Sequence, residues 1–236
     1  IPIAKDASFI KSAEDSEDLY NDDKELNIIF SDVKKTSTIE FIVCIVDKKP
    51  IIPNEYFRTL YFDYYHPVNK INYIINFDKE IAKKLNFLKS GEIPTAKKEQ
   101  LNSGRTLFSW QKSHVQSLDW ESGAAPLGQN GPLLKISTWK SWDDFHQWYS
   151  PLLTSRSQLN NELKAKVNKW VKGHKSPQEI LNILLRKVAD NIRYTGLEFG
   201  LGGYQPHDCN KVWKNQYGDC KDKANLLRVM LATQGI

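Results

Sequence analysis

Cysteine is scarce in this chain, and its scarcity excludes a fold built on disulfide bonds. The 236 residues include three cysteines, which are too few and odd in number for a disulfide framework. No cysteine pair at C-x-x-C spacing is followed by a matching second pair, so a structural zinc site is not expected. No other metal site is predicted. Cys44 lies in the apolar run at residues 41–46, which predicts a buried strand residue. A bond between Cys209 and Cys220 stays open, because spacing does not show whether their Cα atoms approach within about 7 Å.

Long apolar runs and massed charge are also missing. No stretch approaches the ~20 apolar residues of a transmembrane helix, so no transmembrane segment is expected. The net charge of +5 is modest and the lysines stand in scattered doublets, which are typical of solvated faces. Nucleic acid is therefore not an expected partner. No cofactor is expected either. Acidic residues gather between positions 14 and 23, and we interpret residues 1–26 as an acidic loop or linker.

The N-terminal half has the composition of a β-rich domain, which we place at residues 27–140. Its aromatic and β-branched residues predict strands, separated by turn signals. Strands are expected over residues 36–46, 56–65 and 70–77, and one or two more over residues 105–120. For residues 79–89 a short helix and a strand both stay open. Several strands without long helices between them indicate an antiparallel sheet or β-sandwich.

The C-terminal part, residues 141–236, is predicted to be mainly helical. Ser141 is a good helix N-cap, and residues 176–179 (SPQE) form a capping-box pattern with proline at the first helical position. A short helix is expected over residues 208–215. Together the two parts give an α+β chain.

The most informative motif is residues 217–223 (YGDCKDK), which places Cys220 at the start of a helix. A thiol at a helix N-terminus faces unpaired backbone N–H groups, which favour the thiolate and could hold the oxyanion of an acyl-transfer intermediate. Asp219 and Asp222 bracket the cysteine, and we interpret Asp219 as the helix cap and Asp222 as a stabiliser of the first turn. From this heptapeptide alone, an inert small residue at a helix start remains an equal alternative.

Several segments carry a resemblance to the transglutaminase-like superfamily. The segments that carry it most specifically are residues 191–198 (NIRYTGLE), 202–207 (GGYQPH), 212–213 (VW) and 217–224 (YGDCKDKA). More narrowly, the chain resembles bacterial envelope proteins in which a β-rich domain of unknown function precedes a transglutaminase-like core. The resemblance covers residues 55–236, with no usable likeness over residues 1–54. It implies an antiparallel β-sandwich-like domain followed by the helical first part of a transglutaminase-like (papain-like) core.

That superfamily uses a cysteine nucleophile, and Cys220 is the position that matches it. The family's histidine base and orienting aspartate come from strands that follow the cysteine helix. All five histidines here precede Cys220. The catalytic histidine and aspartate are therefore expected beyond residue 236, and this chain alone is expected to be inactive.

Two further residues are candidates for the cleft. Tyr204 and His207 lie in and just after a glycine-rich loop shortly before the motif. Tyr204 could donate its hydroxyl to an oxyanion or substrate, and His207 could line the cleft. A histidine at a helix start beside Asp208 is the plainer interpretation of His207. The seven tryptophans mostly fall on apolar faces, which favours packing over a glycan- or peptide-binding role.

Three functions remain open at this stage. The first is a cysteine-dependent acyl transferase or amide hydrolase, acting on a protein or peptide substrate such as a cell-wall peptide. The second is a non-catalytic member of the same architecture that binds peptide or glycan. The third is a scaffolding module. The resemblance implies a periplasmic or secreted location in the bacterial envelope, and oligomeric state stays open.

Overall fold

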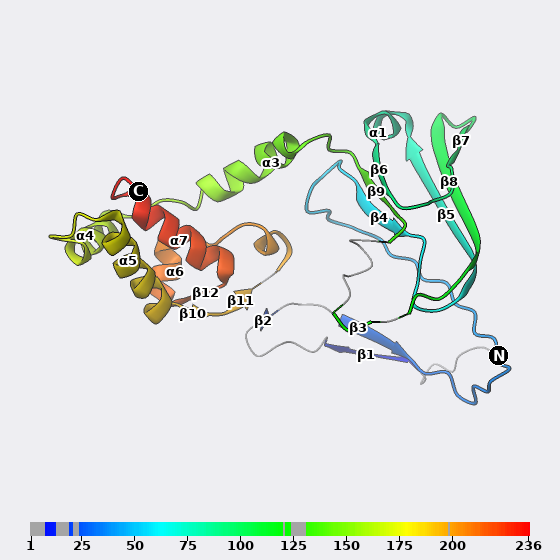
Figure 1. Ribbon diagram of the computed structural model, residues 1–236, viewed down its shortest axis with the longest axis horizontal. Helices are drawn as coiled ribbons and strands as arrows, with labels where there is room; N and C mark the ends of the chain where they lie inside the picture. Colours follow the sequence, from blue (N-terminus) through cyan, green and yellow to red (C-terminus); the bar gives the residue numbers. More distant parts are fainter. Residues whose placement is uncertain (1–7, 13–18, 21–23, 120, 124–130, 198) are drawn as a thin grey trace. The chain divides into compact units, whose positions relative to one another are not determined.

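The chain forms two compact units in a computed structural model (Figure 1). The structure describes residues 8–12, 19–20, 24–119, 121–123, 131–197 and 199–236. One unit, here called the β unit, is Ile52–His146, and the other, the helical unit, joins Ile1–Ile51 to Gln147–Ile236. The boundary at residue 146 falls inside helix α3, Trp142–Thr154.

The β unit consists of two three-stranded antiparallel sheets. Together with the helices of the chain, these sheets make the α+β fold that the sequence predicts. The first sheet has the order β4 (Phe57–Tyr61), β9 (Leu133–Ser137), β6 (Asn86–Ser90). The second has the order β5 (Val68–Asp78), β8 (Arg105–Val115), β7 (Lys97–Gln100). Residues 79–89, for which the sequence allows a helix or a strand, contain both. Helix α1 (Lys79–Lys84) comes first and β6 follows it.

One hydrophobic core joins the two sheets. Alternate residues of β8 are buried, including Phe108 and Trp110, and they pack with Phe62 and with Leu134 and Ile136 of β9. This period-two burial is what a strand with one core-facing side shows. Phe62 is fully buried and its ring meets the edge of Tyr73 at 5.4 Å between centroids. The β unit therefore has a sandwich-like core.

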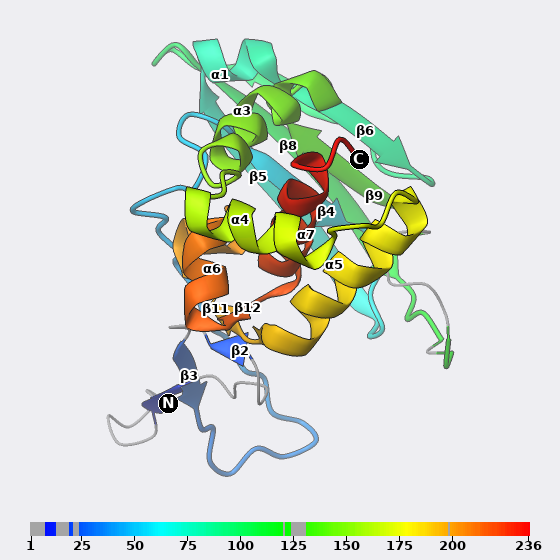
Figure 2. The same ribbon diagram turned by 90° about the vertical axis from the view of Figure 1, so that its left-hand side faces the viewer.

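The helical unit is built on four neighbouring helices (Figure 2). They are α4 (Asn161–Trp170), α5 (Pro177–Asn191), α6 (Cys209–Asn215) and α7 (Cys220–Ala232). Their apolar faces share a core that includes Val167, Leu184, Leu226 and Met230. None of the described helices has both the length and the apolar character needed to span a membrane.

Short strands complete the helical unit. β10 (Arg193–Tyr194) pairs in parallel with β12 (Tyr217–Gly218), directly before α7. β11 (Gly196–Leu197) pairs in parallel with β2 (Leu19–Tyr20), and a 3-10 turn, η2 (Gly200–Gly203), follows. β1 (Ser8–Ser12) pairs antiparallel with β3 (Lys24–Ile28). The segment interpreted as an acidic loop thus contributes strands where the structure describes it.

Three local expectations are wrong. No residue between 29 and 56 lies in a strand, although residues 36–46 have a strand's composition, and Cys44 is exposed rather than buried. A strand needs a partner for its backbone N–H and C=O groups, and no described segment pairs with this one. Helix α5 begins at Pro177 as expected, but the Ser176 side chain makes no capping hydrogen bond.

Candidate functional site

The site is the first turn of α7, where a capping box fixes the chain on both sides of Cys220. Asp219 is the N-cap, and its Oδ1 accepts hydrogen bonds from the N–H groups of Lys221 at 3.0 Å and Asp222 at 3.1 Å. Asp222 Oδ2 accepts in return from the Asp219 N–H at 3.1 Å. Cys220 is the first helical residue and is exposed. Both neighbouring carboxylates therefore hold the backbone, while the thiol faces solvent.

The capping box changes which amides can serve an oxyanion. The sequence suggested that two N–H groups of the first turn were available, but those of Lys221 and Asp222 are occupied by Asp219. The N–H of Cys220 stands at the helix start, where no intrahelical carbonyl can accept it. It is the amide of this turn best placed to donate to a bound carbonyl oxygen.

Asp222 also binds His207, which ties the segment before α6 to the first turn of α7. Asp222 Oδ1 accepts from the His207 backbone N–H at 2.6 Å, and Asp222 Oδ2 lies 2.9 Å from His207 Nδ1. The Asp222 side chain is 1% exposed and that of His207 is 44% exposed. Because a carboxylate only accepts hydrogen bonds, Nδ1 carries the proton in this pair, and Nε2 keeps its lone pair when the ring is neutral.

His207 stands directly before Asp208, the N-cap of α6, as the plainer interpretation expects. Asp208 Oδ1 accepts from the N–H groups of Asn210 and Lys211, and the side-chain partner of His207 is Asp222. The spacing of the DCKD motif indicates that Asp222 takes part in capping the helix. Nothing in the sequence indicates that Asp222 also contacts His207, which lies fifteen positions earlier.

The two lysines of the motif are also fixed. Lys221 Nζ pairs with Asp219 Oδ2, so a positive charge lies against the buried cap. Lys223 Nζ donates to the carbonyl oxygen of Ile192, 2.6 Å away, at the end of α5. Because both ammonium groups are held by other partners, neither is placed as a mobile counter-ion for the thiol.

Gly218 allows the tight entry into α7. A Cβ at this position would lie 2.8 Å from Asp222 Cβ and 2.9 Å from Asp222 Oδ2, closer than real Cβ atoms approach other atoms. The carbonyl of Gly218 accepts from the Thr195 N–H at 3.1 Å, which anchors the turn to the β10–β11 segment. A side chain on residue 218 would therefore push Asp222 away from its hydrogen-bond partners.

Cys209 and Cys220 have different environments and are not bonded to each other. Both are free thiols, with Cys209 buried and Cys220 exposed. Burial, and to a lesser degree the carboxylate of Asp208, raises the pKa of Cys209 to about 12. Asn225 Nδ2 lies 3.5 Å from Cys209 Sγ, so this thiol is part of the packing between α6 and α7. Of these two thiols, Cys220 is thus the accessible one.

Tyr204 packs beside another aromatic residue. Its ring meets the edge of Trp148 in α3, with 5.4 Å between centroids, and the residue is 45% exposed. The described hydrogen bonds of Tyr204 involve its backbone, whose N–H donates to the Leu201 carbonyl. Its suggested contact with an oxyanion therefore remains a prediction.

Among the residues that the structure describes, no three histidine, cysteine, aspartate or glutamate side chains come together as a possible metal site.

A solved structure shares the fold of the whole chain. It is a crystal structure from Parabacteroides distasonis described as a putative protease, with a TM-score of 0.75 and 18% sequence identity. The alignment covers 100% of the present chain and 46% of that chain, so this chain spans less than half the length of its structural neighbour. At this identity the likeness establishes the fold. No curated protein matches the sequence.

A family model matches the N-terminal half. It is described as a domain of unknown function with a solved structure, DUF3857, and it matches residues 1–118. The sequence-based resemblance began at residue 55, so the family assignment extends it to the N-terminal segment that contains β1, β2 and β3. The match spans half of the 236 residues, and the chain therefore belongs to the DUF3857 family.

Proposed function

We propose that Cys220 is the nucleophile of a transglutaminase-like thiol hydrolase or acyltransferase that acts on protein or peptide amides. The proposal depends on the exposed thiol at the first position of α7. It lies between two buried aspartates whose carboxylates accept hydrogen bonds from backbone N–H groups of the capping box. The resemblance of the YGDCKDKA segment supports it. The fold shared with a protein described as a putative protease supports the hydrolytic form of the reaction.

The reaction follows from the chemistry of the thiol. The general base removes the proton of Sγ. The thiolate then attacks the amide carbonyl carbon and a C–S bond forms, while the carbonyl oxygen accepts a hydrogen bond from the Cys220 N–H. The C–N bond then breaks, and the amine leaves with a proton from the general base. Water cleaves the resulting thioester in hydrolysis, whereas a second amine does so in transamidation.

The general base of this proposal is a histidine beyond residue 236, oriented by an aspartate, as the resemblance implies. His207 is the rival base, because its pairing with Asp222 leaves Nε2 free to accept a proton. The two can be separated by substitution, since asparagine reproduces the Nδ1 donor of histidine but has no basic nitrogen.

The test compares four forms of the full-length natural protein on a fluorogenic library of unstructured peptides. Cys220→Ala is expected to abolish hydrolysis while the circular dichroism spectrum is unchanged. His207→Asn is expected to keep the Asp222 hydrogen bond and to retain activity within a few fold, whereas His207→Ala loses about 1 kcal/mol of unfolding free energy. Activity lost in a folded His207→Asn variant would identify His207 as the base. Hydrolysis that survives Cys220→Ala would exclude Cys220 as the nucleophile. Absence of hydrolysis by the unchanged protein would favour a binding or scaffolding module.

We also propose that the protein works in the bacterial envelope, on substrates such as cell-wall peptides. The support is the likeness to envelope proteins that combine a β-rich domain with a transglutaminase-like core. Fractionation of the native cells tests it, because a periplasmic or secreted protein is released by osmotic shock or found in the medium. Recovery in the cytoplasmic fraction alone would overturn it.

A further inference from the structure

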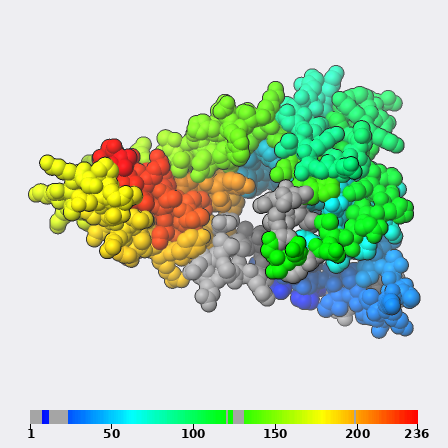
Figure 3. Space-filling view, viewed as in Figure 1, coloured from blue at the N-terminus to red at the C-terminus, as the bar shows by residue number. Residues whose placement is uncertain are grey.

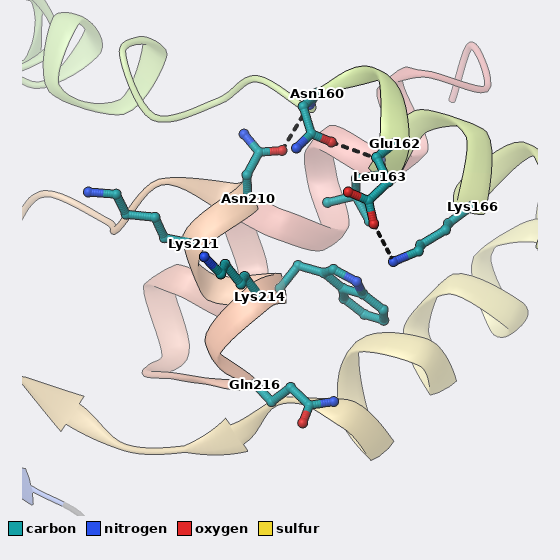
Figure 4. A pocket seen from close by; sticks show the side chains of 9 residues that line it. Asn160, Glu162, Leu163, Lys166, Asn210, Lys211, Lys214 and Gln216 are labelled. Atoms are coloured by element: carbon teal, nitrogen blue, oxygen red, sulfur yellow. Dashed lines mark hydrogen bonds and ion pairs between the residues drawn. The ribbon is translucent and has the colours of Figure 1, made fainter.

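A second candidate site lies on the helical unit, in a cleft between α4 and α6 (Figure 4). The cleft has a volume of about 530 Å³, within the range of roughly 300–1,000 Å³ that ligand pockets occupy. Its lining residues lie on these two helices or cap them. Lys211 and Lys214 are three positions apart on α6, so they share one face, and Gln216 follows at the helix end.

The walls of the cleft are held by hydrogen bonds of their own. The Asn160 N–H donates to Asn210 Oδ1 at 2.8 Å, and Asn160 Oδ1 accepts from the Leu163 N–H at 2.8 Å (Figure 4). The first bond fastens the start of α4 to α6, and the second caps α4 itself. The cleft is therefore formed before any ligand arrives, which lowers the conformational cost of binding.

The charge of the cleft is positive and partly uncompensated. Lys166 pairs with Glu162 at 2.8 Å, so this positive charge is balanced. Among the residues that the structure describes, Lys211 and Lys214 form no ion pair, and both are exposed. Two ammonium groups on one face attract a ligand that carries carboxylates.

Trp213 supplies a flat apolar surface in the same cleft. Its ring is half-buried and packs against Trp170 at 5.1 Å between centroids, which fixes its orientation. A rigid aromatic face beside an amide and two ammonium groups suits a ring with an apolar face, polar hydroxyls and acidic substituents. No strand lines the cleft, so an extended peptide would find no backbone edge to pair with.

We propose that this cleft binds an acidic oligosaccharide. A sugar ring packs on Trp213, and the carboxylates of uronic acid units pair with Lys211 and Lys214. The side-chain amide of Gln216 forms a hydrogen bond with a sugar hydroxyl. The proposal is independent of the chemistry at Cys220.

Isothermal titration of the 236-residue chain with tri-galacturonic acid tests the proposal. Saturable binding is expected, together with at least tenfold weaker binding of the neutral trisaccharide maltotriose. The affinity is expected to fall about tenfold in the double variant Lys211→Gln/Lys214→Gln. Lys164→Gln/Lys172→Gln is the matched control, because it removes the same charge from exposed positions outside the cleft and should stay within twofold of the unchanged chain.

Three results would overturn the assignment. Tri-glutamate binding as tightly as tri-galacturonic acid would assign the cleft to acidic peptides. Equal losses in the two double variants would reduce the binding to general charge attraction. Absence of binding by the unchanged chain at millimolar tri-galacturonic acid would exclude the site.

Discussion

Gly218 has no side chain, and this lets its backbone lie close to Asp222 in the first turn of α7. Replacement by alanine places Cβ 2.8 Å from Asp222 Cβ, and one of the two residues has to move. We expect Gly218→Ala to lower the free energy of unfolding by about 1–3 kcal/mol, the usual cost of forcing an atom into a packed site. Urea denaturation measures it.

Gly203→Ala is the control for this substitution. A Cβ there would meet no atom within 4 Å, and the loss should stay within about 0.5 kcal/mol. Equal losses at the two glycines would show that backbone freedom, and not the contact with Asp222, explains the need for glycine at position 218.

The buried thiol of Cys209 makes stability depend on alkaline pH. Its pKa is about 12 in the folded protein, against roughly 8.5 in an unfolded chain. Above pH 8.5 the unfolded state releases this proton while the folded state keeps it, so stability falls as pH rises toward 12. Between pH 7.5 and 10 we expect the natural chain to lose about 1–2 kcal/mol more than Cys209→Ala, measured by urea midpoints.

Cys44→Ala serves as the comparison at alkaline pH. It removes one exposed thiol in place of the buried one, so it is the matched control for the loss of a cysteine. A Cys209→Ala variant whose stability falls with pH as steeply as that of the natural chain would contradict a raised pKa in the folded state.

At the scale of elements, α5 shows how neighbouring positions of one helix differ. Leu184 is fully buried in the core shared with α4, α6 and α7, whereas Leu185 is 47% exposed. We expect Leu184→Ala to cost about 2–5 kcal/mol of unfolding free energy, because a cavity remains in a packed core. Leu185→Ala should cost less than about 1 kcal/mol. Similar losses in thermal or urea unfolding would mean that α5 presents a different face to the core.

The capping box of α7 is likewise a property of an element. Its residues are close in sequence, so the motif alone indicates the helix start at Asp219. The hydrogen bonds to His207 belong to the packing of α6 on α7, which the motif does not encode.

At the scale of the whole molecule, the chain exposes an apolar segment at residues 39–46. Ile42 is 93% exposed and Ile45 is 85% exposed. The segment belongs to the part of the chain that is drawn in blue in Figure 3. Apolar β-branched runs without a partner promote association between chains. We expect Ile42→Lys to raise the concentration at which the protein stays monodisperse by light scattering, with the unfolding midpoint unchanged.

Gln116→Lys adds the same charge at another exposed position and controls for net charge alone. An equal gain in both variants would attribute the solubility to charge. A large fall in the unfolding midpoint of Ile42→Lys would mean that the segment is packed in solution.

The sequence by itself determined the order of strands before helices, the helix starts at Pro177 and Cys220, and the exclusion of a disulfide framework. These depend on local signals: side-chain periodicity, capping residues and cysteine spacing. Tertiary structure decided the rest. Residues 36–46 have the composition of a strand but lack a described partner, and backbone pairing, not composition, makes a strand. The binding of His207 to Asp222 and the cleft around Lys211 arise from contacts between helices, because side chains far apart in sequence meet only when the apolar faces of those helices pack together.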